Sequence, residues 1–236
     1  MKWVLKVLAI FILGIFGGIF ADQILWPYFV ERPLFYQYRL EKNPIYVTER
    51  KEITIQENTA LKNAIEKVEK VVIGIKTETK QGKTLEGSGL ILTSDGLIVT
   101  LADLVPQGSN FSFFVEGKLV PFQILKRDLK ENLALIKIEA GNLPTVSFFN
   151  FEKLKLGERV FLVGIVQPPN GGWVVNEGIV KSFDDEKIET NIFEKENLSG
   201  SPLFDIEGNV LGLNEIDSQG KVIAIPISKI KSFAGF

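Results

Sequence analysis

Short β-rich runs separated by turn residues fill the chain from about residue 70 onward, and they restrict the fold more than any other feature. Six runs precede a connector at residues 140–151 and about six follow it, with turn signals such as Ser94-Asp95-Gly96 between them. No helix-length pattern separates consecutive runs, so the sequence does not favour a parallel α/β sheet. The pattern predicts an all-β fold, as two antiparallel barrels or a sandwich.

The N-terminal segment predicts a membrane anchor. Residues 3–21 are apolar except for Lys6, and as a helix they extend about 28 Å, which nearly matches a bilayer core of about 30 Å. Lys2 and Lys6 precede the helix, so the positive-inside rule leaves the N-terminus in the cytoplasm. We therefore expect a single-pass cell-membrane protein whose C-terminal domain is extracytoplasmic. A cleaved signal peptide is the alternative, although Ile19 occupies a position where a small residue is preferred.

Residues 22–56 form the expected juxtamembrane segment, in which Pro27, Pro33 and Pro44 should break any long helix. Its aromatic side chains are expected to rest on the membrane surface or on the folded domain: Tyr28, Phe29, Phe35, Tyr36 and Tyr38. Residues 57–68 then show helical spacing of their apolar positions, which predicts a short helix at the start of a domain spanning 57–236.

Composition limits the chemistry. The 236 residues include no Cys and no His, which excludes disulfides, thiolate nucleophiles, Cys-type zinc sites and any imidazole base. The net charge of −2 lacks the basic excess of a nucleic-acid-binding protein. Asp205, Glu207 and Asn209 lie in a predicted hairpin turn that has too few ligands for a calcium loop. We expect no metal, no cofactor and no nucleic-acid partner.

Five sequence segments, in order, resemble the HtrA/DegP type of trypsin-like (chymotrypsin-fold) serine protease. They are GSGLILTSDGLIVTLADLV, ENLALIKI, KLKLGERVFLVG, ENLSGSPLFDIEGNVLGLN and VIAIPIS. The resemblance runs from about Ala64 to Phe233. It implies two antiparallel six-stranded barrels, at about residues 70–140 and 156–227, with the active site between them. Proteases of this type usually carry a PDZ domain after the protease domain, and the sequence to Phe236 leaves no room for one.

The resemblance also implies which positions correspond to the catalytic triad. The family segment around the His base matches TLADLV, and the segment with the orienting Asp matches NLALIK. The nucleophile loop matches NLSGSPL. These matches assign Asp103 to the base position, Asn132 to the acid position and Ser199 to the nucleophile position. The oxyanion-hole positions, which donate backbone N–H groups in the family, are Asn197 and Ser199.

Two of the three triad residues are thus replaced. A Ser hydroxyl is a poor nucleophile without a base beside it, and a carboxylate of ordinary pKa is a weak base at neutral pH. A Ser–Lys dyad, in which Lys195 or Lys137 acts as the base, is another way to activate Ser199. The sequence predicts a catalytically inactive pseudoprotease that acts as an extracytoplasmic module and binds a peptide or protein in the inter-barrel cleft. The alternative is an active serine endopeptidase with a non-standard base, and a purely structural role in the cell envelope also stays open.

Overall fold

The structure is a computed structural model that describes residues 2–31 and 57–236. Contacts divide the chain into two units, Met1–Ile53 and Thr54–Phe236. The predicted effects of Pro33, Pro44 and the aromatics Phe35, Tyr36 and Tyr38 lie outside the described residues.

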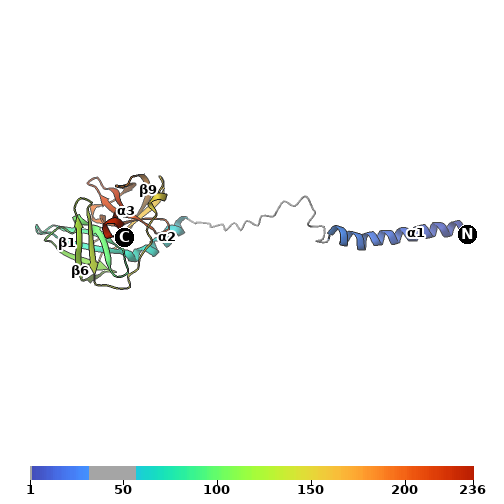
Figure 1. Ribbon diagram of the computed structural model, residues 1–236, viewed down its shortest axis with the longest axis horizontal. Coiled ribbons are helices and arrows are strands. Elements are labelled where there is room, and N and C mark those ends of the chain that lie inside the picture. The colour runs from blue at the N-terminus through green and yellow to red at the C-terminus, as the bar shows by residue number, and fades with distance from the viewer. Residues whose placement is uncertain (1, 32–56) are drawn as a thin grey trace. The chain divides into compact units, whose positions relative to one another are not determined.

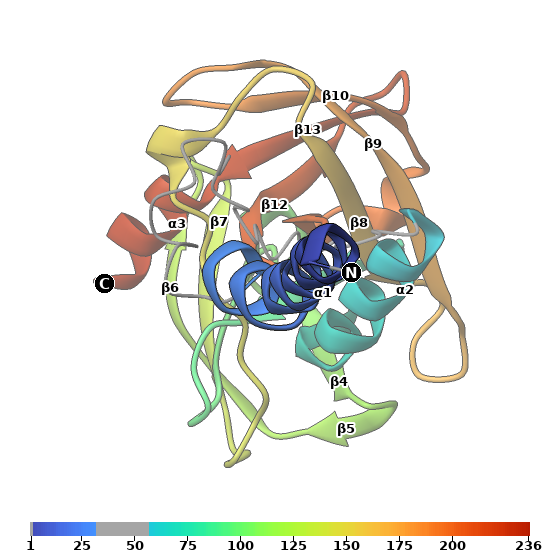
Figure 2. The ribbon, with the colours of Figure 1, turned by 90° about the vertical axis from the view of Figure 1, so that its right-hand side faces the viewer.

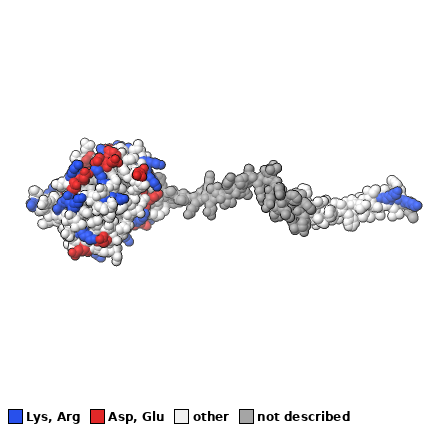
Figure 3. Space-filling model, in the orientation of Figure 1, with Lys and Arg blue, Asp and Glu red and all other residues white. Residues whose placement is uncertain are grey.

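The first unit is helical where it is described. Helix α1 runs from Lys2 to Phe20, and a π-helical segment, η1, continues it from Ala21 to Glu31 (Figure 1). The helix therefore continues through Pro27, which lies within η1, contrary to our expectation. Charged residues of α1 lie only at its N-terminal end (Figure 3).

The helix from Lys2 to Trp26 is long and apolar enough to cross a membrane, and its described side chains are exposed. These properties fit a membrane anchor and a secretion signal equally well.

The second unit is built from a sheet and a barrel, both antiparallel. The first sheet contains seven strands: β1 (Val72–Glu78), β2 (Thr84–Ile91), β3 (Leu97–Leu101), β4 (Asn110–Val115), β5 (Lys118–Val120), β6 (Phe122–Asp128) and β7 (Leu133–Ile138). Its spatial order is β5-β4-β1-β2-β3-β7-β6, so β5 and β6 are unpaired at their outer sides and the sheet is a partly closed barrel. The predicted chymotrypsin-like double barrel is confirmed, with this difference in the first half.

Proline explains why seven strands replace the predicted six. One of the six β-rich runs, KLVPFQIL, contains Pro121, which separates β5 from β6. Proline has no N–H to donate to a sheet and is confined to strand ends and edges. The chain therefore turns at Pro121, β5 pairs with β4 only, and β6 pairs with β7 only.

The second half is a closed barrel with the spatial order β10-β13-β12-β11-β8-β9. Its strands are β8 (Arg159–Ile165), β9 (Trp173–Phe183), β10 (Ile188–Phe193), β11 (Pro202–Asp205), β12 (Val210–Ile216) and β13 (Lys221–Pro226). Figure 2 shows these yellow-to-red strands beside the green strands of the first sheet. Helix α2 (Glu57–Val68) precedes β1, and helix α3 (Ile227–Ala234) follows β13.

Strand β8 joins the two halves, because both of its faces are buried. Val160 and Leu162 belong to the core inside the closed barrel. Phe161 and Val163 alternate with them, so they point the other way and join a core shared with the first sheet. Phe161 stacks on Phe204 with ring centroids 5.4 Å apart. Both halves contribute side chains to this shared core, so it holds the first sheet and the barrel in place against each other.

Candidate active site

A cleft of about 500 Å³ opens between the first sheet and the closed barrel. Its lining comes from β2, from the segment after β3, from the turn before β7 and from β12 and β13 of the barrel. Asp103, Asn132, Asn197 and Ser199 all line it. The fold thus brings together the four positions that the sequence singled out, from segments nearly 100 residues apart.

Asp103 and Asn132 form the first-sheet wall. Asp103 lies in a 3₁₀ turn, Ala102–Leu104, which directly follows β3, and its side chain is exposed. Asn132 precedes β7 with a φ of 50°, a left-handed conformation that Asn tolerates well. The Oδ1 atom of Asn132 accepts the backbone N–H of Asp103 at 3.0 Å, and its Nδ2 donates to Glu215 Oε1 at 2.7 Å. The amide of Asn132 therefore ties the turn to strand β12.

Ser199 lies on the opposite wall and is 7% exposed. It follows a 3₁₀ turn, Glu196–Leu198, and its carbonyl oxygen accepts the backbone N–H of Ser88 at 3.0 Å. Ser88 is fully buried, and its own carbonyl oxygen accepts the hydroxyl of Thr100 at 2.7 Å. The nucleophile loop is thus bonded directly to the first sheet.

Gly200 has a φ of 78°, and a Cβ there would overlap the carbonyl oxygen of Ser88. Its N–H donates to the carbonyl of Asn214 at 2.8 Å. Only glycine fits this position without strain, because it needs both a left-handed backbone and close approach of two chains.

The hydroxyl and the N–H of Ser199 are the groups to which the resemblance assigns catalytic roles. Within residues 2–31 and 57–236, no hydrogen bond joins the Ser199 hydroxyl to a basic group. The N–H of Ser199 donates to the carbonyl of Glu196 at 2.9 Å, inside the chain's own turn. An oxyanion hole needs free N–H donors aimed at the reacting oxygen. In this conformation the donor at Ser199 is already used.

Comparison with known proteins identifies the family of this chain. Residues 87–213, more than half of the chain, match the family described as the trypsin-like peptidase domain. The chain belongs to this family.

Its relatives are of the HtrA type. The chain is 34% identical over 162 residues to the serine protease HTRA1 of Xenopus laevis, covering 62% of this chain and 35% of that protein. It is 30% identical over 137 residues to a probable periplasmic serine endoprotease DegP-like of Halomonas elongata, covering 54% and 28%. It is 29% identical over 164 residues to the putative serine protease HhoB of Synechocystis, covering 63% and 39%. The chain thus matches well under half the length of these relatives.

A solved structure shows the same fold. The serine endoprotease of Yersinia pestis superposes with a TM-score of 0.67 at 20% identity, covering 74% of this chain and 65% of that one. At this identity the likeness establishes the fold alone. The barrel arrangement of a trypsin-like domain therefore belongs to this chain, whereas the roles of Ser199, Asp103, Asn132 and Asn197 in it stay predictions.

The lysines considered as substitute bases lie elsewhere. Lys137 donates from Nζ to Asp95 Oδ2 at 2.6 Å, away from the cleft lining. This ion pair, with a bond from Thr93, lowers the pKa of Asp95. The side chain of Lys195 is exposed and lines an adjoining hollow, which shares Glu196, Ile216 and Asp217 with the cleft. Neither lysine lines the cleft itself.

The turn that contains Asp205 is structural. Asp205 Oδ1 accepts the backbone N–H groups of Glu207 at 2.9 Å and Asn209 at 2.8 Å, and Oδ2 accepts Asn209 Nδ2 at 2.7 Å. The carboxylate therefore holds the β11–β12 hairpin together. No group of three or more His, Cys, Asp or Glu residues in the described parts of the chain is arranged to hold a metal ion.

Sequence reasoning missed several charged residues of the cleft. Glu86, Glu196, Glu215, Asp217 and Lys83 line it together with the predicted positions. Glu215 and Asp217 end the run NVLGLNEID, where the sequence changes from apolar to acidic at the end of a strand. This change marks the end of the strand in the sequence, but it does not indicate which residues face the cleft.

Outside the cleft, ion pairs link neighbouring segments of the fold. Lys187 and Lys221 both bond Glu189 on β10 and lower its pKa to about 2. Lys229 on α3 contacts Glu131, beside Asn132, at 2.6 Å, and it also contacts Glu186. These two carboxylates raise the pKa of Lys229.

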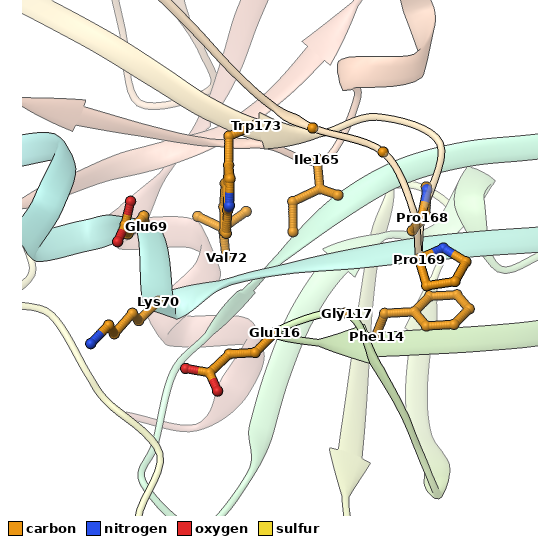
Figure 4. Close-up of a pocket in the computed structure, with 12 residues that line it drawn as sticks. Glu69, Lys70, Val72, Phe114, Glu116, Gly117, Ile165, Pro168, Pro169 and Trp173 are labelled. Carbon is orange, nitrogen blue, oxygen red and sulfur yellow. The ribbon is translucent and has the colours of Figure 1, made fainter.

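A second pocket of about 310 Å³ lies apart from the cleft and shares none of its lining residues (Figure 4). Trp173, Ile165 and Pro168 contribute apolar surface, and Glu69 and Glu116 contribute carboxylates to its lining. It contains none of the positions that resemble the triad.

Proposed function

We propose that this chain is a membrane-anchored, catalytically inactive trypsin-like domain of the HtrA type, which binds extended peptide segments in its inter-barrel cleft. One observation carries the proposal: the chain has no His, and the Ser199 hydroxyl has no base among the described residues. In a comparable protease, loss of the nucleophile or its base costs about 10⁶-fold in turnover. Oxyanion stabilisation, the remaining source of rate, is weakened because Ser199 N–H is bonded to Glu196.

Peptide binding is supported by a free strand edge in the cleft. Strand β12 pairs with β13 as far as Ile216, but its pairing with β11 ends at Leu213. Glu215 and Ile216 therefore have a sheet neighbour on one side only, and both line the cleft. An extended peptide can add to such an edge through backbone hydrogen bonds, a mode that needs no catalytic residue.

We also propose that the helix anchors the protein and that residues 57–236 lie outside the cytoplasm. Lys2 and Lys6 at the start of the helix support this orientation through the positive-inside rule. The relative from Halomonas elongata is named as probably periplasmic, which agrees with this placement. Retention of the intact chain in membranes after alkaline carbonate extraction is the expected result. A soluble form that begins after the apolar segment would identify a signal peptide instead.

The inactivity is tested on the full-length chain in an uncharged detergent. Wild type and Ser199→Ala are compared for hydrolysis of an unstructured protein and for labelling by a fluorophosphonate, which requires an activated Ser. We expect equal background rates and no labelling of Ser199. Labelling or turnover that disappears in Ser199→Ala would establish an active endopeptidase. Titration with unstructured peptides tests the proposed peptide binding. If none of the peptides binds, this part of the proposal is wrong.

A further inference from the structure

The cleft lining is far more acidic than the chain as a whole. The whole sequence has 27 basic and 29 acidic residues, so its charges nearly balance. The cleft lining contains one lysine, Lys83, and five carboxylates, which are Glu86, Asp103, Glu196, Glu215 and Asp217. On the face of the folded unit seen in Figure 3, by contrast, positive and negative residues lie close together.

None of these five carboxylates forms an ion pair with another described residue. Glu86 accepts the backbone N–H of Gln167 at 3.3 Å, and Glu215 accepts the amide of Asn132. Asp217 Oδ1 accepts two backbone N–H groups of its own turn, at 2.8 and 2.9 Å. These donors are neutral, so they leave the negative charge in place.

Several carboxylates elsewhere on the domain do have a basic partner. Glu189 contacts two lysines, Glu131 contacts Lys229, and Glu177 contacts Arg159 at 2.9 Å. The cleft lining, by contrast, places five carboxylates without an ion pair to another described residue around one lysine. A cleft lined by one sign of charge attracts a ligand of the opposite sign.

Two further features point to a peptide ligand in the same place. The oxygen Oδ1 of Asn197 is buried and has no hydrogen-bond partner, although Asn197 lines the cleft. A buried acceptor without a donor costs free energy, which a ligand N–H can recover. The lining of the cleft also includes the apolar side chains of Leu101, Leu104 and Ile223.

We infer that the cleft selects extended peptide segments that carry Lys or Arg beside apolar side chains. This inference rests on the proposed peptide-binding function and specifies its ligand. Backbone pairing with β12 positions the peptide. Its basic side chains then approach the five carboxylates, while its apolar ones cover Leu101, Leu104 and Ile223.

The test uses three acetylated and amidated unstructured peptides of one length. They differ only at two positions, two residues apart, where they carry Lys, Gln or Glu, so that both side chains share one face of an extended strand. Affinity for the full-length chain in an uncharged detergent is measured by titration. We expect the Lys peptide to bind about tenfold more tightly than the Gln peptide at about 0.05 M salt, and this ratio to shrink at about 0.5 M salt.

Variants locate the effect. Asp103→Asn with Glu196→Gln removes two cleft charges that accept no hydrogen bond from described residues, and it should remove most of the preference for Lys. Glu69→Gln with Glu116→Gln removes two charges from the second pocket and is the matched control (Figure 4). The control should bind the Lys peptide as wild type does.

Each other outcome is decisive. If the Lys, Gln and Glu peptides bind equally, the charge preference is wrong while the peptide-binding function stands. If no peptide binds, both proposals fall. If the Lys preference persists in the cleft variant, the basic side chains bind elsewhere and the inference is overturned.

Discussion

The two walls of the cleft differ in how firmly the fold holds them. On the barrel wall, Ser199 is almost fully buried, and Gly200 packs against Ser88 with no room for a side chain. On the first-sheet wall, the side chain of Asp103 is exposed. The position proposed for the nucleophile, Ser199, is the one that packing and backbone hydrogen bonds constrain.

The motif residues are thus of two kinds: some are held by contacts within the fold, and others have side chains exposed to solvent. The loop around Ser199 links the two halves through the Ser88–Ser199 hydrogen bond, so it matters to the fold whether or not it does chemistry. The side chain at position 103 contacts solvent, and only catalysis would require an imidazole there. We therefore expect the fold to tolerate a change at position 103 more easily than a change in the loop around Ser199.

Gly200→Ala should have the largest effect on stability. The new methyl group meets the backbone of Ser88 at a left-handed position, so the free energy of unfolding should fall by about 3 kcal/mol or more. Asp103→Ala should change it by less than about 0.5 kcal/mol. Urea unfolding followed by circular dichroism measures both. Gly172→Ala is the control, because a Cβ there meets nothing within 4 Å. Equal losses at Gly200 and Asp103 would contradict the contrast between the walls.

Restoring the missing chemistry should have an intermediate effect, on activity. The substitutions are Asp103→His, Asn132→Asp and Asn197→Gly. Asn132→Asp would also place a carboxylate against Glu215, so Glu215→Gln must accompany them to remove the repulsion. The combined variant should hydrolyse an unstructured protein about tenfold faster than the same variant with Ser199→Ala. Each single variant should stay at background, because triad members act as a unit.

Activity from Asp103→His alone would mean that Asn132, with Glu215 behind it, already orients an imidazole. No activity in the combined variant would show that the turn holding Ser199 N–H on Glu196 blocks the oxyanion hole.

Acid sensitivity should give the smallest effect and tests the contrast between paired and unpaired carboxylates. Lys187 and Lys221 lower the pKa of Glu189 to about 2 in the folded state. A lowered pKa contributes stability above the unfolded pKa of about 4.3, and that contribution is lost as the pH falls towards 2. The stability gap between wild type and Glu189→Gln should therefore close between about pH 5 and pH 2 in urea titrations. Glu196→Gln is the control variant, because it removes a carboxylate that has no ion pair among described residues.

The strands were predictable because alternating apolar residues and turn residues are local signals. Residues 159–166 and 173–183 show such signals, and β8 and β9 occupy Arg159–Ile165 and Trp173–Phe183. Pro121 is itself a local signal for the division between β5 and β6, since proline cannot donate to a sheet. Whether the first sheet closes depends on pairing between distant strands, which no local pattern encodes.

Only those residues of the candidate site that lie in a recognisable sequence motif could be predicted. The sequence motifs indicated Ser199, Asp103, Asn132 and Asn197, and all four line one cleft. The bond from Asn132 to Glu215 joins residues 83 positions apart, and the sequence contains no sign of it. The bond that occupies Ser199 N–H depends on the backbone path of a short turn, which residue types alone do not determine.

Strand β8, buried on both faces, makes the two halves of the domain mutually dependent during unfolding. Removing it from the barrel would expose Val160 and Leu162, and the same movement would expose Phe161 and Val163 in the shared core. Separation of the two halves would also expose the side chains of the shared core, even if the barrel kept its own interior. The domain should therefore open as one cooperative unit, with the amide hydrogens of β8 among the last to exchange with solvent.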